Sequence, residues 1–505
     1  MIANRREMGD WQTPVDFAIK CCEVVRDCCN FEPANIVEPT CGVGNFIEAA
    51  RYVFPNAKIY GVELNEDYVD IAREKFCNDK HVEIMQGNFF TEKTSAKIIQ
   101  DSSALVLGNP PWVTNSMLSS LDSDNLPKKT NYKRLRGIEA ITGASNFDIC
   151  EWIIMHALEN FRGDDDMLAM LCKTSVARNV CVELAKRNDN VSCRMLEFDS
   201  KKVFNINASA CLLICDFRAA KVSIFEGRLD YPTDVHPLAF NGASLTKPLS
   251  EELKPLNGKC QLEWRQGVKH DCSKVMELQY KHGMLLNKLG EDVDIEIEYL
   301  FPLIKSSQAR TYLINDSEMA IPMTQRAIGD DTSWLKIKAP KFWNYLESHA
   351  ELFDARKSSI YKNAPRYAMF GVGDYSYAKY KVAISGFYKD PIFALAYGSK
   401  PIMFDDTCYF LSFDNKMDAW ICMLLLNSNP VKEFFRTVAF LDSKRPFSKK
   451  VLSKLDLVEA LELVGASGLN ETADELSVNI RVSDDDTNHF RSLLNKGNSL
   501  RLFSL

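Results

Sequence analysis

The sequence contains no long apolar run and no apolar leader. A membrane-spanning helix needs about 18 or more consecutive apolar residues, and no such run occurs among the 505 residues. The first residues, MIANRREMGDWQTP, also lack the apolar stretch of a secretory signal peptide. Heptad repeats and low-complexity tracts are missing too. These absences exclude a membrane-spanning chain, and we expect a cytoplasmic protein without a membrane partner.

Disulfide bonds are not expected either, although the chain carries 16 cysteines. Cytoplasmic thiols stay reduced. Cys21, Cys22, Cys28 and Cys29 stand close together, but their adjacent pairs do not have zinc-finger spacing. The surrounding segment, VDFAIKCCEVVRDCCNF, has the periodicity of a helix. We therefore expect these thiols to be buried small apolar groups, and we predict no metal site.

Positive charge does not dominate the chain, because the net charge is −7. Such a protein can still bind nucleic acid through a local basic groove. Two basic segments offer one, LPKKTNYKRLRG and LDSKRPFSKK. Their basic residues are Lys128, Lys129, Lys133, Arg134 and Arg136 in the first, and Lys444, Arg445, Lys449 and Lys450 in the second. Each segment is either a solvated loop or a contact to phosphate groups.

From about residue 30 to 220, short apolar runs alternate with amphipathic segments of helical length. This alternation predicts an α/β, Rossmann-like domain with a mainly parallel sheet and helices on both faces. Ligands of such sheets bind beyond the carboxyl ends of the strands. The segments EPTCGVGN, ELN, GNFF and NPPW all follow predicted strands, so we expect them to form the functional site.

The pattern changes after about residue 220 to irregular α+β material with long polar connections. The composition, 46% hydrophobic and 26% charged, is that of a globular protein with room for several domains. We predict a catalytic domain over 1–225 and a second, α+β domain over 226–460. The polar, acidic tail over 461–505 is expected to be loose or to form a helix that packs on the second domain.

A glycine-bearing turn follows the first predicted strand, in EPTCGVGNF. Gly42 and Gly44 allow the backbone to bend tightly and to approach a ligand, and the helix after them offers free N–H groups. The segment is neither the full dinucleotide-binding fingerprint nor a phosphate-binding P-loop. It predicts either a ligand-binding turn or a purely structural one.

The next two strand ends carry an acidic, an amide and two aromatic side chains. Glu63 ends the second strand, about 20 residues after the glycine turn, where an acidic residue can bind ribose hydroxyls. A surface glutamate is the alternative. In GNFF, Asn88 can hydrogen-bond an adenine edge, and either Phe89 or Phe90 can stack on the ring while the other joins the core.

The fourth strand ends in NPPW, a rigid corner. Pro110 and Pro111 fix the backbone and hold the residues before them extended. The side-chain oxygen of Asn109 and the carbonyl of Pro110 then stand as two fixed acceptors, which suit an exocyclic amino group. Trp112 offers a flat face on which a base can stack. A structural turn with a core tryptophan is the alternative.

The order EPTCGVGNF, GVELN, GNFF and GNPPW resembles the gamma-class, N6-adenine-specific DNA methyltransferases of restriction-modification systems. In that family the cofactor motif precedes an NPP[YFW] motif, and a target-recognition domain follows both. The resemblance covers residues 10–220 well. It extends more loosely into the C-terminal half, through EWRQGVKHD, EYLFPLIKSSQ, YKVAISGFYK, LLLNSNPV and KRPFSKKVL. It implies a site-specific enzyme that uses S-adenosylmethionine, acts on double-stranded DNA, and works with or without a separate cognate restriction endonuclease. We expect a monomer, because one catalytic and one recognition domain can read one asymmetric site.

The resemblance also implies roles for single residues. Those implied to bind the cofactor are Gln12, Thr13, Pro14, Glu38, Pro39, Cys41, Gly42, Gly44, Glu63, Leu64, Asn88 and Phe89. Most relatives have Asp at the position of Asn88. Those implied to hold the target base are Asn109, Pro110, Pro111, Trp112 and, in KVFNINASACLLICDF, Phe204. Phosphate contacts are implied for Lys128, Lys129, Lys133, Arg134 and Arg136, and the base-reading candidates are Arg265, Lys269, His270 and Lys305.

The mechanism implied for such a site begins with base flipping, because a duplex hides the adenine amino group. Accepting both N–H bonds at Asn109 and Pro110 localises the nitrogen lone pair, which then attacks the sulfonium methyl group in line. The nitrogen loses its proton after transfer, so no strong general base is needed. A cytosine-C5 enzyme needs a Pro-Cys loop, and the chain contains no PC dipeptide.

Other interpretations of the motifs remain open. Methyltransferases of RNA or of protein glutamine also use NPP motifs, but about 280 residues follow the catalytic region here, which favours a DNA-reading domain. A cytosine-N4 enzyme more often carries Ser in place of Asn109. A bifunctional restriction enzyme needs a nuclease domain, and only about 35 residues precede the first strand. A non-catalytic DNA-binding module would need neither NPPW nor the glycine turn.

Overall fold

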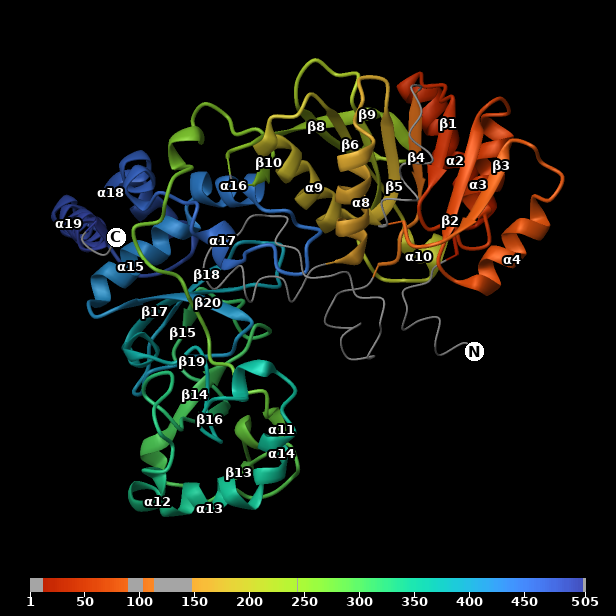
Figure 1. Ribbon diagram of the computed structural model, residues 1–505. Helices are drawn as coiled ribbons and strands as arrows, with labels where there is room; N and C mark the ends of the chain where they lie inside the picture. Colours follow the sequence, from red (N-terminus) through yellow and green to blue (C-terminus); the bar gives the residue numbers. More distant parts are fainter. Residues whose placement is uncertain (1–11, 90–102, 113–147, 243, 503–505) are drawn as a thin grey trace. The chain divides into compact units, whose positions relative to one another are not determined.

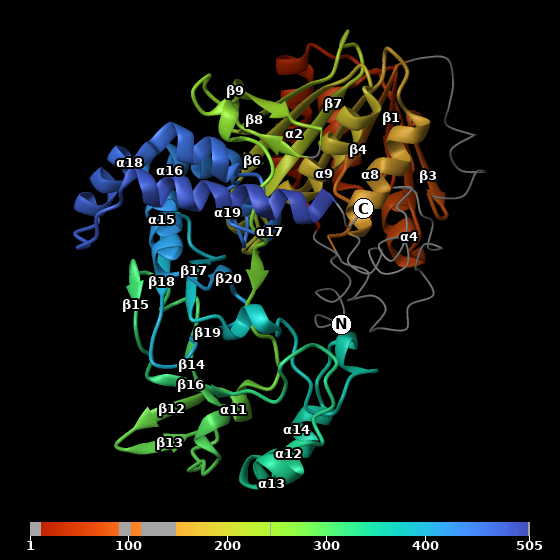
Figure 2. The ribbon, with the colours of Figure 1, turned by 90° about the vertical axis from the view of Figure 1, so that its left-hand side faces the viewer.

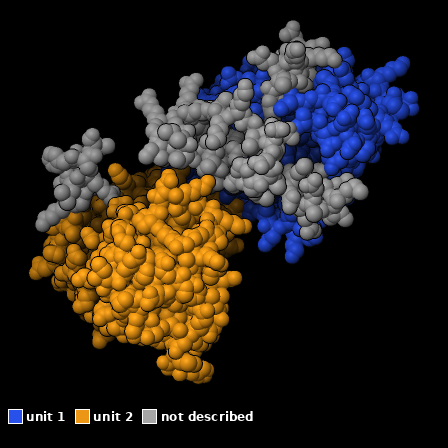
Figure 3. Space-filling view, turned by 60° about the horizontal axis from the view of Figure 1, so that its bottom comes forward, with its two compact units in different colours: residues 1–248 blue, residues 249–505 orange. Residues whose placement is uncertain are grey.

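The computed structural model describes residues 12–89, 103–112, 148–242 and 244–502. The chain divides into two compact units, residues 1–248 and residues 249–505 (Figure 3). Each unit is built around sheets of its own.

The first unit contains one large, mainly parallel sheet (Figures 1 and 2). Its strand order is β10-β9-β8-β6-β7-β5-β4-β1-β2-β3. Neighbouring strands from β3 through β5 are all parallel, whereas β7 runs antiparallel to both β5 and β6. The strands are β1 (Asn35–Glu38), β2 (Lys58–Glu63), β3 (Val82–Gln86), β4 (Ala104–Gly108), β5 (Met167–Lys173), β6 (Ser192–Phe198), β7 (Ala210–Asp216), β8 (Ser223–Arg228), β9 (Tyr231–Phe240) and β10 (Leu245–Thr246).

Helices cover both faces of this sheet (Figure 2). Helix α2 packs on α3, and α8 packs on α9. The helices are α2 (Val15–Cys29), α3 (Asn45–Val53), α4 (Glu66–Lys75), α8 (Ile149–Asn160), α9 (Thr174–Arg187) and α10 (Ser200–Phe204). This arrangement confirms the predicted Rossmann-like α/β class. Strands β8 to β10 continue the sheet past residue 225, where the sequence pattern placed a boundary, and the first unit ends at Pro248.

The centre of the sheet is formed by strands that are apolar on both faces. Every residue of β4 is buried, and so is all of β5 except Lys173. A strand covered by helices on both faces needs such a continuous apolar run, rather than the alternation of a half-exposed strand. The polar residues of this region are therefore confined to the ends of the strands.

The second unit contains two five-stranded sheets. The first has the order β11-β20-β17-β18-β15 and the second β13-β12-β16-β14-β19. The strands are β11 (Arg265–Gln266), β12 (Leu278–Lys281), β13 (Met284–Leu286), β14 (Leu300–Ile304), β15 (Leu313–Ile314), β16 (Met319–Pro322), β17 (Tyr380–Ser385), β18 (Phe393–Ala396), β19 (Met403–Phe404) and β20 (Cys408–Phe413).

A helical layer packs on the first of these sheets. Helix α15 is buried along nearly its whole length and contacts β17, β18, β20, α16, α18 and α19. The helices of the unit are α11 (Ser273–Met276), α12 (Leu335–Lys338), α13 (Pro340–Ser348), α14 (Ala350–Asp354), α15 (Lys416–Asn427), α16 (Asn429–Val438), α17 (Lys449–Leu452), α18 (Leu457–Glu475) and α19 (Asp484–Leu502). Much of the segment 461–505 thus lies in α18 and α19.

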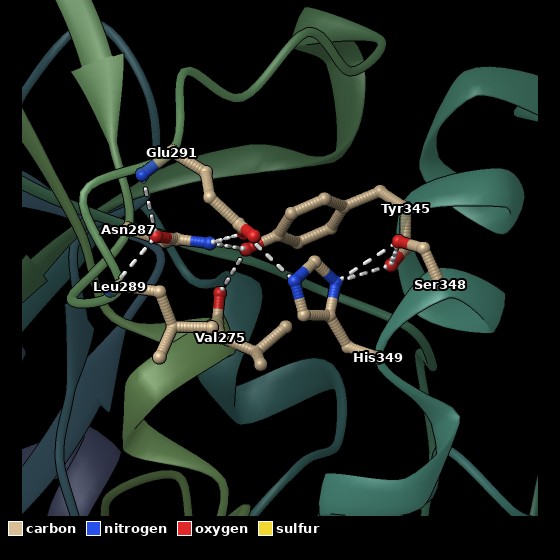
Figure 4. A network of polar contacts seen from close by, with 7 residues as sticks. All are labelled: Val275, Asn287, Leu289, Glu291, Tyr345, Ser348 and His349. Atoms are coloured by element: carbon tan, nitrogen blue, oxygen red, sulfur yellow. Dashed lines mark hydrogen bonds and ion pairs between the residues drawn. The ribbon is translucent and has the colours of Figure 1, made fainter.

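A polar network ties the loop after β13 to α13 and α14 (Figure 4). Asn287 donates from its side-chain amide to the Glu291 carboxylate at 2.6 Å and to the Tyr345 hydroxyl at 3.0 Å. The same hydroxyl donates to the carbonyl of Val275 at 2.8 Å. His349 Nε2 lies 2.7 Å from the Glu291 carboxylate. Each of these polar groups has a partner. The network therefore holds together four segments of the unit, namely α11, the loop after β13, α13 and the start of α14.

Candidate active site

The four motifs taken from the sequence lie at one edge of the first sheet. Strands β3, β2, β1 and β4 are consecutive in the sheet and run parallel. Their carboxyl ends, at Gln86, Glu63, Glu38 and Gly108, therefore meet at the same edge. The structure thus brings the glycine turn, Glu63, GNFF and NPPW together, as expected for a ligand site of this fold.

The glycine turn after β1 needs both of its glycines. Gly42 has φ +52° and Gly44 has φ +81°, a region that other residues rarely adopt. A Cβ on Gly42 would lie 2.9 Å from the side-chain nitrogen of Gln12, and a Cβ on Gly44 would lie 2.6 Å from the ring of Phe76. The N–H of Gly44 donates to the carbonyl of Cys41 at 2.8 Å. The turn is therefore tight and closely covered.

The carboxylate of Glu63 holds this turn against the end of β2. One oxygen accepts the N–H of Gly42 at 2.8 Å. The other accepts the N–H groups of Leu64 and Asn65, both at 2.8 Å. Leu64 itself is 47% exposed. Glu63 is half-buried, so its carboxylate stands at the rim of the site with a fixed orientation.

A second carboxylate, that of Glu38, is buried at the bottom of the site. Only 4% of the residue is exposed, and its Oε2 has no hydrogen-bond partner among the described residues. Burial raises the pKa of Glu38 well above its usual range, and the negative charge of Glu63 raises it further. Burying an ionised carboxylate is costly when one of its oxygens has no hydrogen-bond partner. The arrangement therefore fits a ligand that brings a cationic or donor group to Glu38.

The segment before α2 closes the other side of the turn. The carbonyl of Thr13 accepts a hydrogen bond from the side-chain amide of Asn45 at 2.9 Å, which joins this segment to the start of α3. Thr13 is 4% exposed, and its hydroxyl also has no partner in the described part of the chain. Gln12 and Pro14 are exposed, and Pro39 and Cys41 are buried. Together with Glu38, this hydroxyl gives the site two buried polar atoms that suit a ligand.

The GNFF motif presents its two described side chains in different ways. Asn88 is exposed, whereas Phe89 is 2% exposed and packs edge-on against the ring of His156 on α8, with 5.6 Å between the ring centroids. Burial lowers the pKa of His156. Phe90 lies outside the described residues. Asn88 can therefore face a ligand, and Phe89 connects the site to α8.

The NPPW corner follows a glycine that β4 requires. Gly108 has φ +154°, and a Cβ there would lie 3.2 Å from Cγ of Glu38. The corner therefore starts directly beside the buried carboxylate. Asn109 and Pro111 are half-buried and Pro110 is buried.

The tryptophan of the corner packs on the phenylalanine that the family resemblance paired with it. Trp112 is 6% exposed and donates from Nε1 to the carbonyl of Leu171 at 3.4 Å. Its ring meets Phe204 at 5.5 Å between centroids and 76° between planes, an edge-to-face geometry. Phe17 and Phe198 extend this aromatic cluster. Residues from four segments thus form an apolar wall behind the corner.

Sequence reasoning missed two further residues: Lys173, which contacts the corner, and Asp148, which pairs with Lys173. Lys173, the last residue of β5, donates from Nζ to the carbonyl of Trp112 at 3.3 Å and to the carboxylate of Asp148 at 2.8 Å. Asp148 caps α8 by accepting the N–H of Cys150 at 3.1 Å. A lysine that ends an otherwise apolar strand, in MLAMLCK, was the available signal.

Several predicted positions fall elsewhere. The basic residues Lys128, Lys129, Lys133, Arg134 and Arg136 lie outside the described residues. In α2, Cys21, Cys22 and Cys29 are buried and Cys28 is half-buried. Across the described ranges, no group of three or more His, Cys, Asp or Glu side chains could hold a metal ion. No helix within the described ranges is both long and apolar enough to cross a membrane.

The base-reading candidates of the second unit are engaged with neighbours. Arg265 stacks on the ring of Tyr375 at 4.5 Å. Lys269 pairs with Asp271 at 3.4 Å. Lys305 pairs with Glu277 at 2.8 Å. The buried ring of His270 lies 3.9 Å from the same carboxylate. Of these, His270 is the least suited to contact a partner, because it is only 7% exposed.

Comparison with known proteins adds to this geometry. No family model matches the chain. The type II methyltransferase M.NspV of Nostoc sp. is 43% identical over 466 residues, which are 90% of this chain and 97% of that protein. The type II methyltransferase M.CvrRI of Paramecium bursaria Chlorella virus XZ-6E is 31% identical over 34% of this chain and 38% of its own.

A solved structure matches across nearly the whole chain. The type IIL restriction-modification enzyme MmeI, determined in complex with DNA, superposes with a TM-score of 0.51 and 13% sequence identity. The match covers 96% of this chain and 73% of that one. It supports the fold described above, and the extended identity to M.NspV settles the family. The chain belongs to the type II methyltransferases.

Proposed function

We propose that this protein transfers a methyl group from S-adenosylmethionine to the N6 amino group of adenine in a short sequence of double-stranded DNA. The observation that carries the proposal is the position of the NPPW corner. It leaves the carboxyl end of β4 directly beside Glu38, next to the glycine turn of β1. A site for a methyl donor and a site for an amino group are therefore adjacent.

The residues around the glycine turn fit the proposed cofactor. Glu38 and Thr13 offer buried oxygen atoms to the amino group of its methionine part. Glu63, at the rim, suits the ribose hydroxyls, and the exposed Asn88 suits the adenine ring. S-adenosylmethionine supplies an electrophilic methyl group when it is bound. The chain contributes the orientation of that group relative to the target.

The NPPW corner fits the amino group of the target. The side-chain oxygen of Asn109 and the carbonyl of Pro110 are the two acceptors for its N–H bonds. Accepting both bonds localises the nitrogen lone pair, which makes the nitrogen a better nucleophile. The Pro110–Pro111 pair keeps the acceptors in place because its φ angles are fixed. The nitrogen then loses one proton to water, so the chain does not have to supply a strong base.

Double-stranded DNA is the substrate class that best accounts for the rest of the chain. The relative M.NspV is named a type II methyltransferase, and MmeI was determined with DNA bound. The second unit would then be the target-recognition domain, and residues Lys128 to Arg136 would contact phosphate groups. We place the enzyme in the cytoplasm as a monomer, within a restriction-modification system that works with a separate cognate nuclease or with none.

The test uses purified protein, S-adenosylmethionine with a tritiated methyl group, and unmethylated bacterial DNA. Digestion to nucleosides and mass spectrometry should identify the labelled product as N6-methyl-2′-deoxyadenosine. Label in N4-methylcytosine would contradict the adenine assignment. Label that appears only in RNA or in protein, offered in parallel reactions, would contradict the DNA assignment.

A further inference from the structure

The backbone of the NPPW corner is held by a lysine outside the motif. Nζ of Lys173 lies 3.3 Å from the carbonyl oxygen of Trp112 and 2.8 Å from the Asp148 carboxylate. In the sequence, Trp112 lies 61 residues before Lys173 and Asp148 lies 25 residues before it. A single ammonium group therefore joins the ends of β4 and β5 to the start of α8.

The contact is sheltered from water. The side chain of Lys173 is 29% exposed and that of Asp148 only 10%. Removing one partner of a sheltered charged pair costs more stability than removing one partner of a surface pair, because the other charge is left without compensation. Burial raises the pKa of Asp148, and the hydrogen bond from Lys173 opposes that rise. The ammonium group thus favours the charged form of this carboxylate.

The surrounding contacts restrain each partner in turn. Asp148 is fixed by its cap on α8. Lys173 precedes α9, and α9 is linked back to α8 by the hydrogen bond from Asn179 to Glu151 at 2.9 Å. The indole of Trp112 is held separately, through Leu171 on β5. Among the side chains described above, that of Lys173 is the one that hydrogen-bonds to the carbonyl of Trp112.

We propose that Lys173 is a positioning residue for methyl transfer. Held by Asp148, it fixes the Trp112 carbonyl and through it the backbone that carries Asn109 and Pro110. A small displacement of those two acceptors would leave one N–H of the target amino group without a partner. This inference rests on the proposed function, because it concerns the same reaction.

The experiment measures single-turnover methylation of DNA with enzyme in excess, so that product release does not limit the rate. Lys173→Met should lower this rate by roughly 10- to 100-fold. The dissociation constants for S-adenosylmethionine and DNA should stay close to those of the unmodified protein. Lys173→Arg keeps the charge and the donors, and it should restore much of the rate.

A matched control is available in the same unit. Lys20 on α2 pairs with Asp230 at 2.5 Å, and both side chains are about half exposed. Lys20→Met removes the same charge from a side chain that pairs with Asp230 and not with the corner, so it should leave the single-turnover rate unchanged. If Lys173→Met fails to fold, Asp148→Asn takes its place, since Asn is also a good helix cap. Asp148→Asn should also lower the single-turnover rate of methylation.

The outcomes separate the two claims. An unmodified enzyme that methylates DNA, with a Lys173→Met variant that is equally fast, overturns this inference alone. A variant whose rate, affinities and melting temperature all fall together also overturns it, because that pattern shows a structural role. An unmodified protein that methylates no DNA overturns the proposed function and this inference with it.

Discussion

The Glu63 carboxylate accepts the backbone N–H of Gly42 at 2.8 Å, across 21 residues of sequence. This bond joins the turn after β1 to the end of β2, the two strand ends between which the cofactor is proposed to lie. One acidic side chain thus shapes the glycine turn and stands where ribose hydroxyls would bind.

Replacement of Glu63 should therefore weaken cofactor binding. Glu63→Ala removes three hydrogen bonds to backbone N–H groups and the proposed ribose contact. The proposed ribose contact is one hydrogen bond to a charged group, which contributes about 1.5–3 kcal/mol, so its loss should raise the dissociation constant for S-adenosylmethionine by roughly 10- to 100-fold. Isothermal titration calorimetry measures it. Glu74→Ala, an exposed change on α4, is the control; equal affinities of the two variants would refute the role of Glu63.

The glycine turn allows a stability test with a built-in reference. Gly44 and Gly242 have nearly the same φ, +81° and +85°, but only at Gly44 would an added Cβ meet a neighbour, the ring of Phe76 at 2.6 Å. Gly242→Ala should cost about 1–2 kcal/mol of unfolding free energy for its backbone conformation. Gly44→Ala should cost about 1–3 kcal/mol more, because it also overpacks the site. Urea unfolding of both variants measures the difference. Similar losses of unfolding free energy would contradict the prediction, because they would show that the ring of Phe76 moves aside at little cost.

His270 should make the second unit sensitive to acid. Burial lowers the pKa of His270 to about 4, and Nδ1 accepts the N–H of Cys272 at 3.1 Å, which requires that nitrogen to be unprotonated. The unfolded histidine has a pKa of about 6.5. Between pH 6.5 and 4 the unfolded chain thus binds a proton that the folded chain excludes. The free energy of unfolding therefore keeps its full value with respect to His270 above pH 6.5. It falls by up to about 3 kcal/mol as the pH drops to 4.

The groups facing His270 do not reverse this trend. Glu277, 3.9 Å away, favours the protonated ring, but its carboxylate is already paired with Lys288 and Lys305. Thermal unfolding between pH 4 and pH 7 should show a shallower loss of stability in His270→Gln than in the unmodified protein. His236→Gln, at an exposed position of the first unit, should keep the full loss. The same pH dependence in both variants would rule out His270 as the cause.

The sequence allowed the first sheet and the strand-end motifs to be predicted because both follow from local patterns. Apolar runs such as ALVLG are typical of buried parallel strands, and polar segments directly after them must lie at the carboxyl edge. The position of β7 could not be predicted in this way. Its run ACLLICD is as apolar as that of a parallel strand, yet it pairs antiparallel with β5 and β6.

The contacts that could not be predicted are those between residues distant in sequence. Lys173 reaches Trp112 and Asp148 from another strand, and no spacing rule connects the three. The packing of Trp112 on Phe204 likewise depends on how α10 sits on the sheet. The family resemblance placed both aromatic residues near the target base, whereas their edge-to-face contact needed the structure.

The most direct test of the account is the methylation of DNA in a host that lacks its own methyltransferases. DNA from cells that express the protein is compared, by single-molecule sequencing, with DNA from cells that express Asn109→Ala. We predict N6-methyladenine at one short sequence, reduced at least about 100-fold by the substitution because one of two acceptors at the reacting nitrogen is lost. DNA without modified adenine, from cells whose purified protein binds S-adenosylmethionine, would contradict the account, as would equal methylation by the Asn109→Ala variant.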